Sequence, residues 1–333
     1  MEKSSDAQQI KNIADKLVKA WERAEVSCID HIVLENAFIH FTMFGRDIGR
    51  QALKEAFAAR TRKTSFVKFE IVNYVCLIEK GKAQQSFGLI GAFADQEEGE
   101  WKRFGFEGIF VNSLTETENG WKFSSVKFEY SNEDSIQWPR LYSTGIDQIP
   151  GRGDISFVAN WKNPHHDDRI GWHEGTEIPV VNAEYDAPWY VIQNRENPGT
   201  DEEQIRETYF RYAFGIDFYS FQLYEDVFTE DAVMIYGDEQ PYDKRSVVDM
   251  LKSERQGSCR CVHWAIFKNI DIHGDTADAK MYLRGCVIPD HYQIDEKSLN
   301  KRIGWARYKL NYKKIDGKWL IHRMIFYPGF VEF

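Results

Sequence analysis

The chain repeats its own pattern, and this duplication restricts its fold more than any other feature of the sequence. A shift of 195 residues places Ser5 on Thr200, and each of these residues starts a hydroxyl-x-x-Gln/Glu pattern typical of the N-terminal end of a helix. With a small insertion, 102–106 then matches 301–305, and 119–121 matches 316–319. Few positions are identical, but the common order and near-constant offset predict two copies of one structural unit.

Each copy is predicted to begin with helices and to end with antiparallel strands. In the second copy, apolar residues recur at helical spacing over 205–216, and we expect a short helix at 220–228, a strand at 233–236 and a helix at 246–254. Apolar and other residues then alternate with a period of two from 262 onward, and Gly-Asp and Asp-Gly pairs mark hairpin turns. Helices followed by a run of antiparallel strands indicate the α+β class.

The length and the repeats together give the domain boundaries. A chain of 333 residues is long enough for two domains, which we place at 1–131 and 200–333. The intervening segment, 132–199, holds six of the nine prolines and four of the ten tryptophans. Because tryptophan side chains bury large apolar areas, we interpret this segment as an irregular strap packed across both domains. A third small domain is the alternative.

Composition excludes several classes of function. The net charge is -10 and the pI is near 5.5, whereas a protein that binds nucleic acid or an anionic membrane surface needs a basic face. The sequence has no apolar run of about 18 residues and no apolar signal core at its N-terminal end. We therefore expect a soluble, cytoplasmic protein without a nucleic-acid or membrane partner.

The motifs of the second copy resemble a known family. Residues 212–217, Leu223 and 228–232 are similar to the start of the SnoaL-like branch of the NTF2-like superfamily. The resemblance covers most of both repeats but not the strap. It implies two tandem cone-shaped α+β barrels, in which a curved antiparallel sheet wraps over helices. Members of this superfamily include dehydratases, isomerases, cyclases and proteins without enzymatic activity, so the fold alone does not decide the function.

Four residues in the second copy make the resemblance more specific. Tyr212 and Asp217 lie on the first predicted helix, Tyr236 ends the first strand, and His263 lies on a later strand. This order is similar to the Tyr/Asp/Tyr/His set of bile acid 7α-dehydratase and, more loosely, of scytalone dehydratase. That likeness implies elimination of water without a metal or an organic cofactor. Histidine suits the role of a base near neutral pH, a carboxylate orients it, and tyrosine hydroxyls stabilise a developing oxyanion.

Each of these four residues also has a purely structural interpretation. Tyr212 and Tyr236 can be core residues, Asp217 an exposed acid or a cap, and His263 a core histidine. Residues five apart on a helix lie about 140° apart around its axis, so Tyr212 and Asp217 can border one wide cavity but not one narrow stripe.

The first copy lacks most of this set. The same shift places Tyr212 on Leu17, Asp217 on Glu22 and Tyr236 on Phe41. His263 falls on either Lys68 or Phe69, so only the acid is retained. We therefore expect a catalytically silent first domain, although Glu22 leaves open some activity as a base.

Other potential ligands give no convincing metal site. Cys259 and Cys261 are too close in sequence for a usual zinc site, and the five cysteines are scattered, which argues against a disulfide framework. The segment 165–168, His-His-Asp-Asp, is typical of a solvated loop. His322 either enters the pocket or is structural. We expect neither a metal nor an organic cofactor.

These observations favour a cofactor-independent lyase, foremost a dehydratase, whose active site lies in the second domain. The expected partner is a small apolar carbonyl compound, steroid-like or aromatic/polyketide. An isomerase or aldol-type lyase with the same machinery is one alternative, and a non-catalytic ligand-binding or interaction module is another. We expect the two domains to pair within the chain, with further assembly into homo-oligomers left open.

Overall fold

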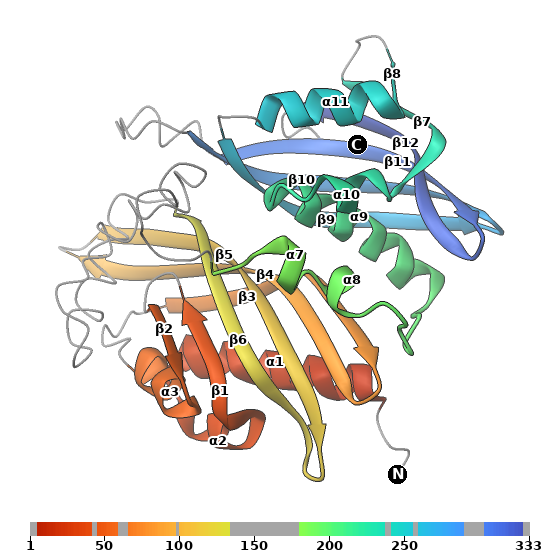
Figure 1. Cartoon of the computed structure of the whole chain (residues 1–333). Helices are drawn as coiled ribbons and strands as arrows, with labels where there is room; N and C mark the ends of the chain where they lie inside the picture. Colours follow the sequence, from red (N-terminus) through yellow and green to blue (C-terminus); the bar gives the residue numbers. More distant parts are fainter. Residues whose placement is uncertain are drawn as a thin grey trace. The chain divides into compact units, whose positions relative to one another are not determined.

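The computed structural model describes residues 5–41, 45–58, 66–97, 100–133, 180–236, 241–255, 259–289 and 303–328 (Figure 1). The chain divides into two units, Met1–Asn197 and Pro198–Phe333. The predicted strap at 132–199 lies mostly outside the described residues, but its final part, from 180 onward, is described, and residues 180–197 belong to the first unit. No helix in the described ranges has both the length and the apolar character needed to cross a membrane.

The first unit begins with helices, continues with four long strands and ends with two short helices. Its six-stranded sheet has the order β2-β1-β6-β5-β4-β3, in which all pairs are antiparallel except β1 with β6. The elements are α1 (Asp6–Arg23), η1 (Val26–Cys28), α2 (Ile29–Ile32), β1 (Val33–Phe41), β2 (Gly45–Ile48), α3 (Arg50–Ala58), β3 (Phe66–Glu79), β4 (Lys82–Glu97), β5 (Glu100–Thr117), β6 (Gly120–Glu133), α7 (Ala183–Asp186) and α8 (Pro188–Val191).

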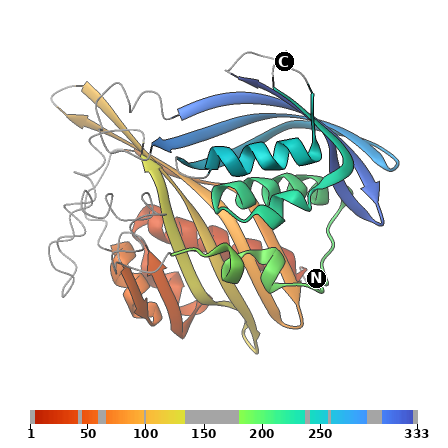
Figure 2. The same ribbon diagram turned by 45° about the horizontal axis from the view of Figure 1, so that its top comes forward.

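The second unit has the same topology. Its six-stranded sheet has the order β8-β7-β12-β11-β10-β9, and β7 with β12 is its parallel pair. Figure 2 shows helices α9 and α11 on one face of this sheet. The elements are α9 (Asp201–Asp217), α10 (Phe221–Glu225), β7 (Phe228–Tyr236), β8 (Tyr242–Asp243), α11 (Lys244–Arg255), β9 (Cys259–His273), β10 (Thr276–Pro289), β11 (Ile303–Ile315) and β12 (Lys318–Pro328).

The two matching sheets confirm the predicted α+β class and fit the tandem duplication. Ser5 and Thr200 are the N-caps of α1 and α9, as the sequence indicated. Thr200 forms a complete capping box: its hydroxyl accepts from the backbone N–H of Glu203, whose carboxylate accepts from the backbone N–H of Thr200. The parallel pair in each sheet was not predicted, because the sequence pattern indicated only antiparallel hairpins.

The helix that opens each unit is held by apolar packing against the sheet. In the first unit, the Trp21 ring stacks on Phe57 with centroids 5.4 Å apart and makes edge contacts with Phe41, Phe69 and Phe128. All five side chains are buried. Aromatic burial on this scale is a major source of stability, and it fills the interior of the first unit with hydrocarbon rings.

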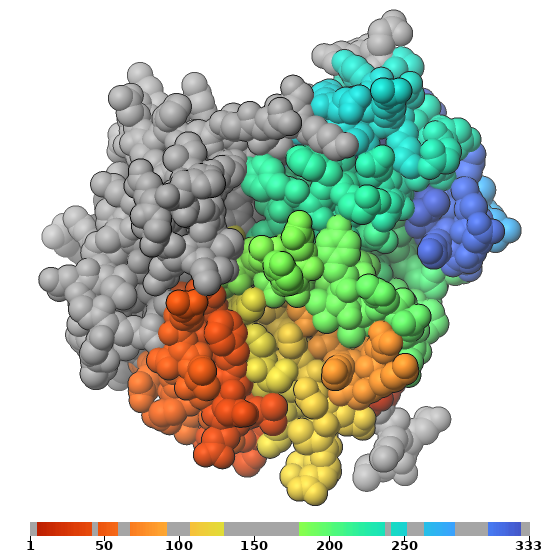
Figure 3. Space-filling view, viewed as in Figure 1, coloured from red at the N-terminus to blue at the C-terminus, as the bar shows by residue number. Residues whose placement is uncertain are grey.

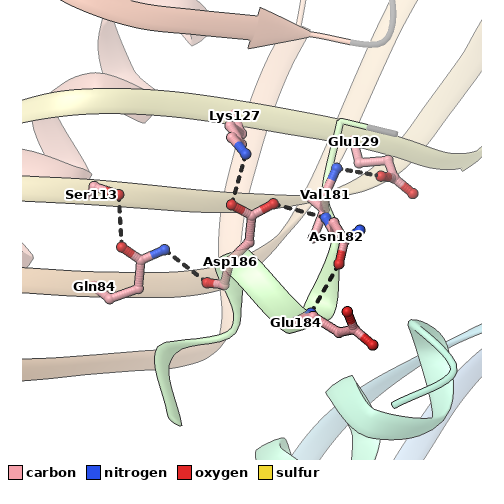
Figure 4. A network of polar contacts seen from close by, with 8 residues as sticks. All are labelled: Gln84, Ser113, Lys127, Glu129, Val181, Asn182, Glu184 and Asp186. Atoms are coloured by element: carbon pink, nitrogen blue, oxygen red, sulfur yellow. Dashed lines mark hydrogen bonds and ion pairs between the residues drawn. The ribbon is translucent and has the colours of Figure 1, made fainter. Parts of the chain in front are cut away.

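The described end of the strap packs on the first sheet. Asp186 accepts from the Nζ of Lys127 at 2.7 Å and from the backbone N–H of Asn182 at 2.8 Å (Figure 4). The backbone N–H of Val181 donates to Glu129 on the same strand, β6. In the space-filling view, this segment (light green) lies against the strands of the first unit (Figure 3). The partly buried ion pair and these backbone bonds therefore hold residues 180–192 on the face of the sheet opposite α1.

Candidate active site

Asp217 and His263 meet inside the second unit. Asp217 is the last residue of α9, and His263 lies near the start of β9. The Nδ1 atom of His263 is 2.6 Å from Oδ1 of Asp217, and the backbone N–H of His263 donates to Oδ2 at 3.0 Å. Only 4% of Asp217 and 8% of His263 are exposed. One carboxylate thus forms hydrogen bonds with both the ring and the backbone of the histidine, which fixes the position and the plane of the imidazole.

This contact also selects the tautomer of the imidazole. An ionised carboxylate only accepts hydrogen bonds, so Nδ1 must carry the proton that bridges to Asp217. The lone pair of a neutral ring then lies on Nε2. The pair is therefore arranged for Nε2 to accept a proton, and the carboxylate stabilises the imidazolium that results.

The end of α9 is built to bring this acid inside. Residues 212–217 are all buried, so this part of the helix has no solvent-facing side. Gly215 permits close packing with α10, because a Cβ there would lie 2.9 Å from the backbone nitrogen of Tyr224. The C-terminal end of a helix carries partial negative charge, which favours a cation nearby. A protonated His263 would be stabilised by this end of α9 as well as by Asp217.

The first unit contains the same backbone contact without the imidazole. Glu22, near the end of α1, accepts a hydrogen bond from the backbone N–H of Phe69 at 2.6 Å. Phe69 pairs with Gly91 as His263 pairs with Gly285, so Phe69 rather than Lys68 is the equivalent of His263. The bond from carboxylate to backbone therefore belongs to the fold, whereas the imidazole is specific to the second unit.

Tyr212 and Tyr236 lie in aromatic clusters of the same unit. Tyr212 is buried, and its ring lies 5.5 Å from Tyr209 and 5.7 Å from Phe228. Tyr236, at the end of β7, is partly buried and contacts Phe326 at 5.4 Å. The structure thus brings Asp217 and His263 into direct contact and places the two tyrosines in the surrounding aromatic core. Their proposed contact with a substrate oxygen stays a prediction.

Three further tyrosines lie in this interior. Tyr209, Tyr308 and Tyr312 are buried, and the Tyr209 ring is 5.9 Å from that of Tyr308. Burial, reinforced by Tyr308, Tyr212, Tyr312 and Asp217, raises the pKa of Tyr209 well above its usual value. Burial also raises the pKa of Tyr312. The phenols of Tyr209 and Tyr312 therefore stay protonated and can donate hydrogen bonds.

The strand registers show which residues of the first unit these tyrosines replace. Tyr308 pairs with Phe326 as Phe110 pairs with Phe128, and Tyr312 pairs with Ile321 as Leu114 pairs with Phe123. Six inward positions carry a polar group in the second unit and hydrocarbon in the first. The pairs are Tyr209 and Ala14, Tyr212 and Leu17, Tyr236 and Phe41, His263 and Phe69, Tyr308 and Phe110, and Tyr312 and Leu114. These replacements of apolar by polar residues are visible in the alignment of the two repeats, but only when the strand registers show which residues are equivalent.

Two glycines lie beside His263 in the sheet. His263 pairs with Gly285 on β10, and Gly285 pairs with Gly304 on β11. The corresponding row in the first unit is Phe69, Gly91 and Phe106. In the second unit the two strands next to the imidazole therefore contribute no side chain at this level, which suits close approach of a ligand to the sheet.

The remaining candidate ligands lie elsewhere. His322 belongs to a separate polar cluster, in which its Nδ1 is 3.3 Å from both the Thr229 hydroxyl and the Asp231 carboxylate. Cys259 and Cys261 both lie on β9, but their side chains are outside the described part of the chain. The segment 165–168 also lies outside the described residues.

A family model agrees with the sequence motifs. Residues 199–325 match the model of the SnoaL-like domain, a range that runs from just before α9 into β12. The resemblance predicted for the second copy is thereby confirmed. A comparison with curated proteins gives no match.

Three solved structures are similar to about two fifths of the chain. A conserved protein from Planctomyces limnophilus DSM 3776 is 18% identical, with a TM-score of 0.34 over 39% of this chain and 98% of its own. An NTF2-like protein of unknown function from Pseudomonas putida KT2440 is 16% identical, with a TM-score of 0.32 over 39% and 87%. A putative scytalone dehydratase from Novosphingobium aromaticivorans DSM 12444 is 16% identical, with a TM-score of 0.35 over 39% and 85%.

Proposed function

We propose that the second unit is a cofactor-independent lyase, a dehydratase that acts on an apolar carbonyl compound. The observation that carries this proposal is the pair of contacts between Asp217 and His263. The fold needs only one of them, because the first unit retains the bond to the backbone and replaces the imidazole by the Phe69 ring. An oriented base in the second unit is therefore best explained by a catalytic role.

The proposed reaction begins with proton abstraction. Nε2 of His263 takes a proton from the carbon next to the substrate carbonyl, and the electron pair of the broken C–H bond moves into an enolate. Tyr212 and Tyr236 donate hydrogen bonds to the enolate oxygen, where negative charge builds. Asp217 accepts from Nδ1 and stabilises the imidazolium.

Loss of water completes the reaction. The enolate electrons form a carbon–carbon double bond, and the bond from the neighbouring carbon to its hydroxyl group breaks. The proton on Nε2 joins the departing hydroxide, which leaves as water. His263 is neutral again at the end of the cycle, and no oxidant, reductant or metal is consumed.

The composition of the interior supports an apolar substrate. The buried groups of the second unit are mainly aromatic or aliphatic, including Tyr209, Tyr308 and Phe326. The SnoaL-like family match is consistent with small-molecule chemistry in this unit. In the first unit the equivalent interior is occupied by packed rings around Trp21, so we propose that it is catalytically silent.

The test is a turnover screen with β-hydroxy ketones on apolar ring systems, followed by mass spectrometry. A dehydratase yields a product lighter by one water, whereas an isomerase yields a product of unchanged mass and an aldol-type lyase yields two fragments. The control is His263→Phe, which installs the residue of the first repeat. Equal turnover by the wild type and His263→Phe would overturn the mechanism, and binding without turnover would favour a binding module.

A further inference from the structure

Two buried hydroxyl groups in the second unit lack a hydrogen-bond partner among the residues that the structure describes. The side-chain oxygens of Tyr209 and Tyr312 make no hydrogen bond within the described part of the chain, although 0% and 1% of these residues are exposed. A buried polar group without a partner is costly, and native structures contain few of them. Each such hydroxyl therefore needs an explanation.

The fold itself does not require either hydroxyl. The equivalent residues of the first unit are Ala14 and Leu114, which are buried and carry no polar atom in the side chain. Tyr224, in the same core, differs from the two tyrosines because its hydroxyl donates to the backbone oxygen of Val248. These two hydroxyls are thus an addition of the second unit for which the described residues supply no hydrogen-bond partner.

The helix and the sheet give independent estimates of where the two tyrosines lie along the interior. Tyr209 precedes Asp217 by eight residues on α9, a rise of about 12 Å. Tyr308, which contacts Tyr209, lies opposite Met281, and Met281 lies opposite Phe267. Phe267 follows His263 by four residues, about 13 Å along the strand. Both routes place the backbone of Tyr209 about 12–13 Å along the interior from the backbone of the proposed acid–base pair, and Tyr312 lies beyond Tyr308 on β11.

We infer that Tyr209 and Tyr312 form a second polar subsite that holds an oxygen atom of the substrate at the end remote from His263. This inference rests on the proposed function, and it narrows the substrate class. The substrate is an elongated apolar carbonyl compound, such as a fused-ring ketone, with a second carbonyl or hydroxyl oxygen on a ring distant from the reacting carbon. Neutral phenols are donors, so the group they hold is an acceptor.

The test uses two probes that differ in one oxygen. One is a steroid diketone with carbonyl groups on its first and last rings, and the other is the monoketone that keeps only the first-ring carbonyl. Binding to the full chain is measured by calorimetry. We expect the wild type to prefer the diketone by about fivefold or more, as a neutral hydrogen bond allows. Tyr209→Phe and Tyr312→Phe should lose this preference and bind the monoketone as the wild type does.

Thermal unfolding of the ligand-free variants separates a ligand subsite from a structural role. Since the two hydroxyls have no hydrogen-bond partner among the described residues, Tyr209→Phe and Tyr312→Phe should melt no lower than the wild type. The matched control is Tyr224→Phe, which should keep the preference for the diketone and melt lower, because its hydroxyl is bonded. A lower melting temperature for the first two variants would overturn the inference, as it would reveal a structural partner such as a buried water.

Failure of the proposed subsite can be distinguished from failure of the proposed function. In a His263→Ala background, turnover should be lost while the preference for the diketone persists. If His263→Ala retains turnover but Tyr209→Phe loses the preference, the mechanism fails and the subsite stands. A wild type that does not distinguish the two ketones overturns the subsite, whatever the role of His263.

Discussion

Phe69 and His263 occupy the same register position in the two repeats, and each donates its backbone N–H to the carboxylate at the end of the first helix of its unit. The acceptors are Glu22 and Asp217. Only in the second unit does the side chain at this position return to the same carboxylate. One chain therefore contains the backbone contact both without and with the additional bond to an imidazole, which makes the first repeat an internal control for the second.

The first prediction concerns His263→Phe. Because Phe69 fits the equivalent place, the variant should fold with little change in melting temperature. Its turnover should fall by roughly 10²–10⁴-fold, the usual contribution of a positioned general base. The measurement is the rate of water loss under saturating substrate, beside a thermal melt. A variant that folds and turns over at the wild-type rate would remove His263 from the mechanism.

The second prediction compares Asp217→Asn with Glu22→Gln. In each variant an amide oxygen can still accept from the backbone N–H, so both should fold. In Asp217→Asn the imidazole loses its charged partner and its fixed tautomer, and we expect turnover to fall by roughly 10²-fold or more. Glu22→Gln should leave turnover unchanged. Equal losses in the two variants would indicate a general structural effect rather than orientation of the base.

Much of the fold follows from local sequence, because capping boxes, hairpin turns and the period of apolar residues act within a few residues. Asp316-Gly317, for example, forms a two-residue hairpin turn in which both residues have positive φ. The parallel pairing of β7 with β12 joins segments almost a hundred residues apart, and no local pattern specifies it.

The site was predicted only in part, again because no local pattern specifies the pairing of strands that are distant in sequence. Residue types and order indicated Asp217 and His263, and the structure brings them together. The first-repeat equivalent of His263 stayed ambiguous between Lys68 and Phe69, because a shift of one residue moves a side chain to the other face of a sheet. The hydroxyl groups of Tyr308 and Tyr312 were missed, because the inward orientation of these side chains follows from strand registers that the sequence pattern does not reveal.

The third prediction concerns the segment that covers the first sheet. Lys127→Ala should leave the buried carboxylate of Asp186 without its cation. It should destabilise the first unit by roughly 1–3 kcal/mol, because a buried charged group then lacks its charged partner. Amide hydrogen exchange over 180–192 should become faster. The double variant Lys127→Met with Asp186→Asn should recover part of the loss, because it leaves no charge unpaired. If single and double variants exchange equally fast, the ion pair does not fasten the segment.

The last prediction concerns the acid side of the stability profile. The Thr229 hydroxyl, then Lys313 and more weakly His322, lower the pKa of Asp231 to about 2. A carboxyl group whose pKa is lower in the folded state than in the unfolded chain stabilises the fold above its unfolded pKa of about 4, and this contribution is lost as the pH falls toward 2. Asp231→Asn, which installs the residue found at Asn36 in the first repeat, should therefore melt below the wild type at neutral pH. The difference in melting temperature should stay constant down to about pH 5 and vanish near pH 2. Thr229→Val should shrink this pH-dependent difference more than Lys313→Gln does, because the hydroxyl is the larger influence. A difference between wild type and Asp231→Asn that persists unchanged to pH 2 would show that Asp231 acts through packing rather than through its charge.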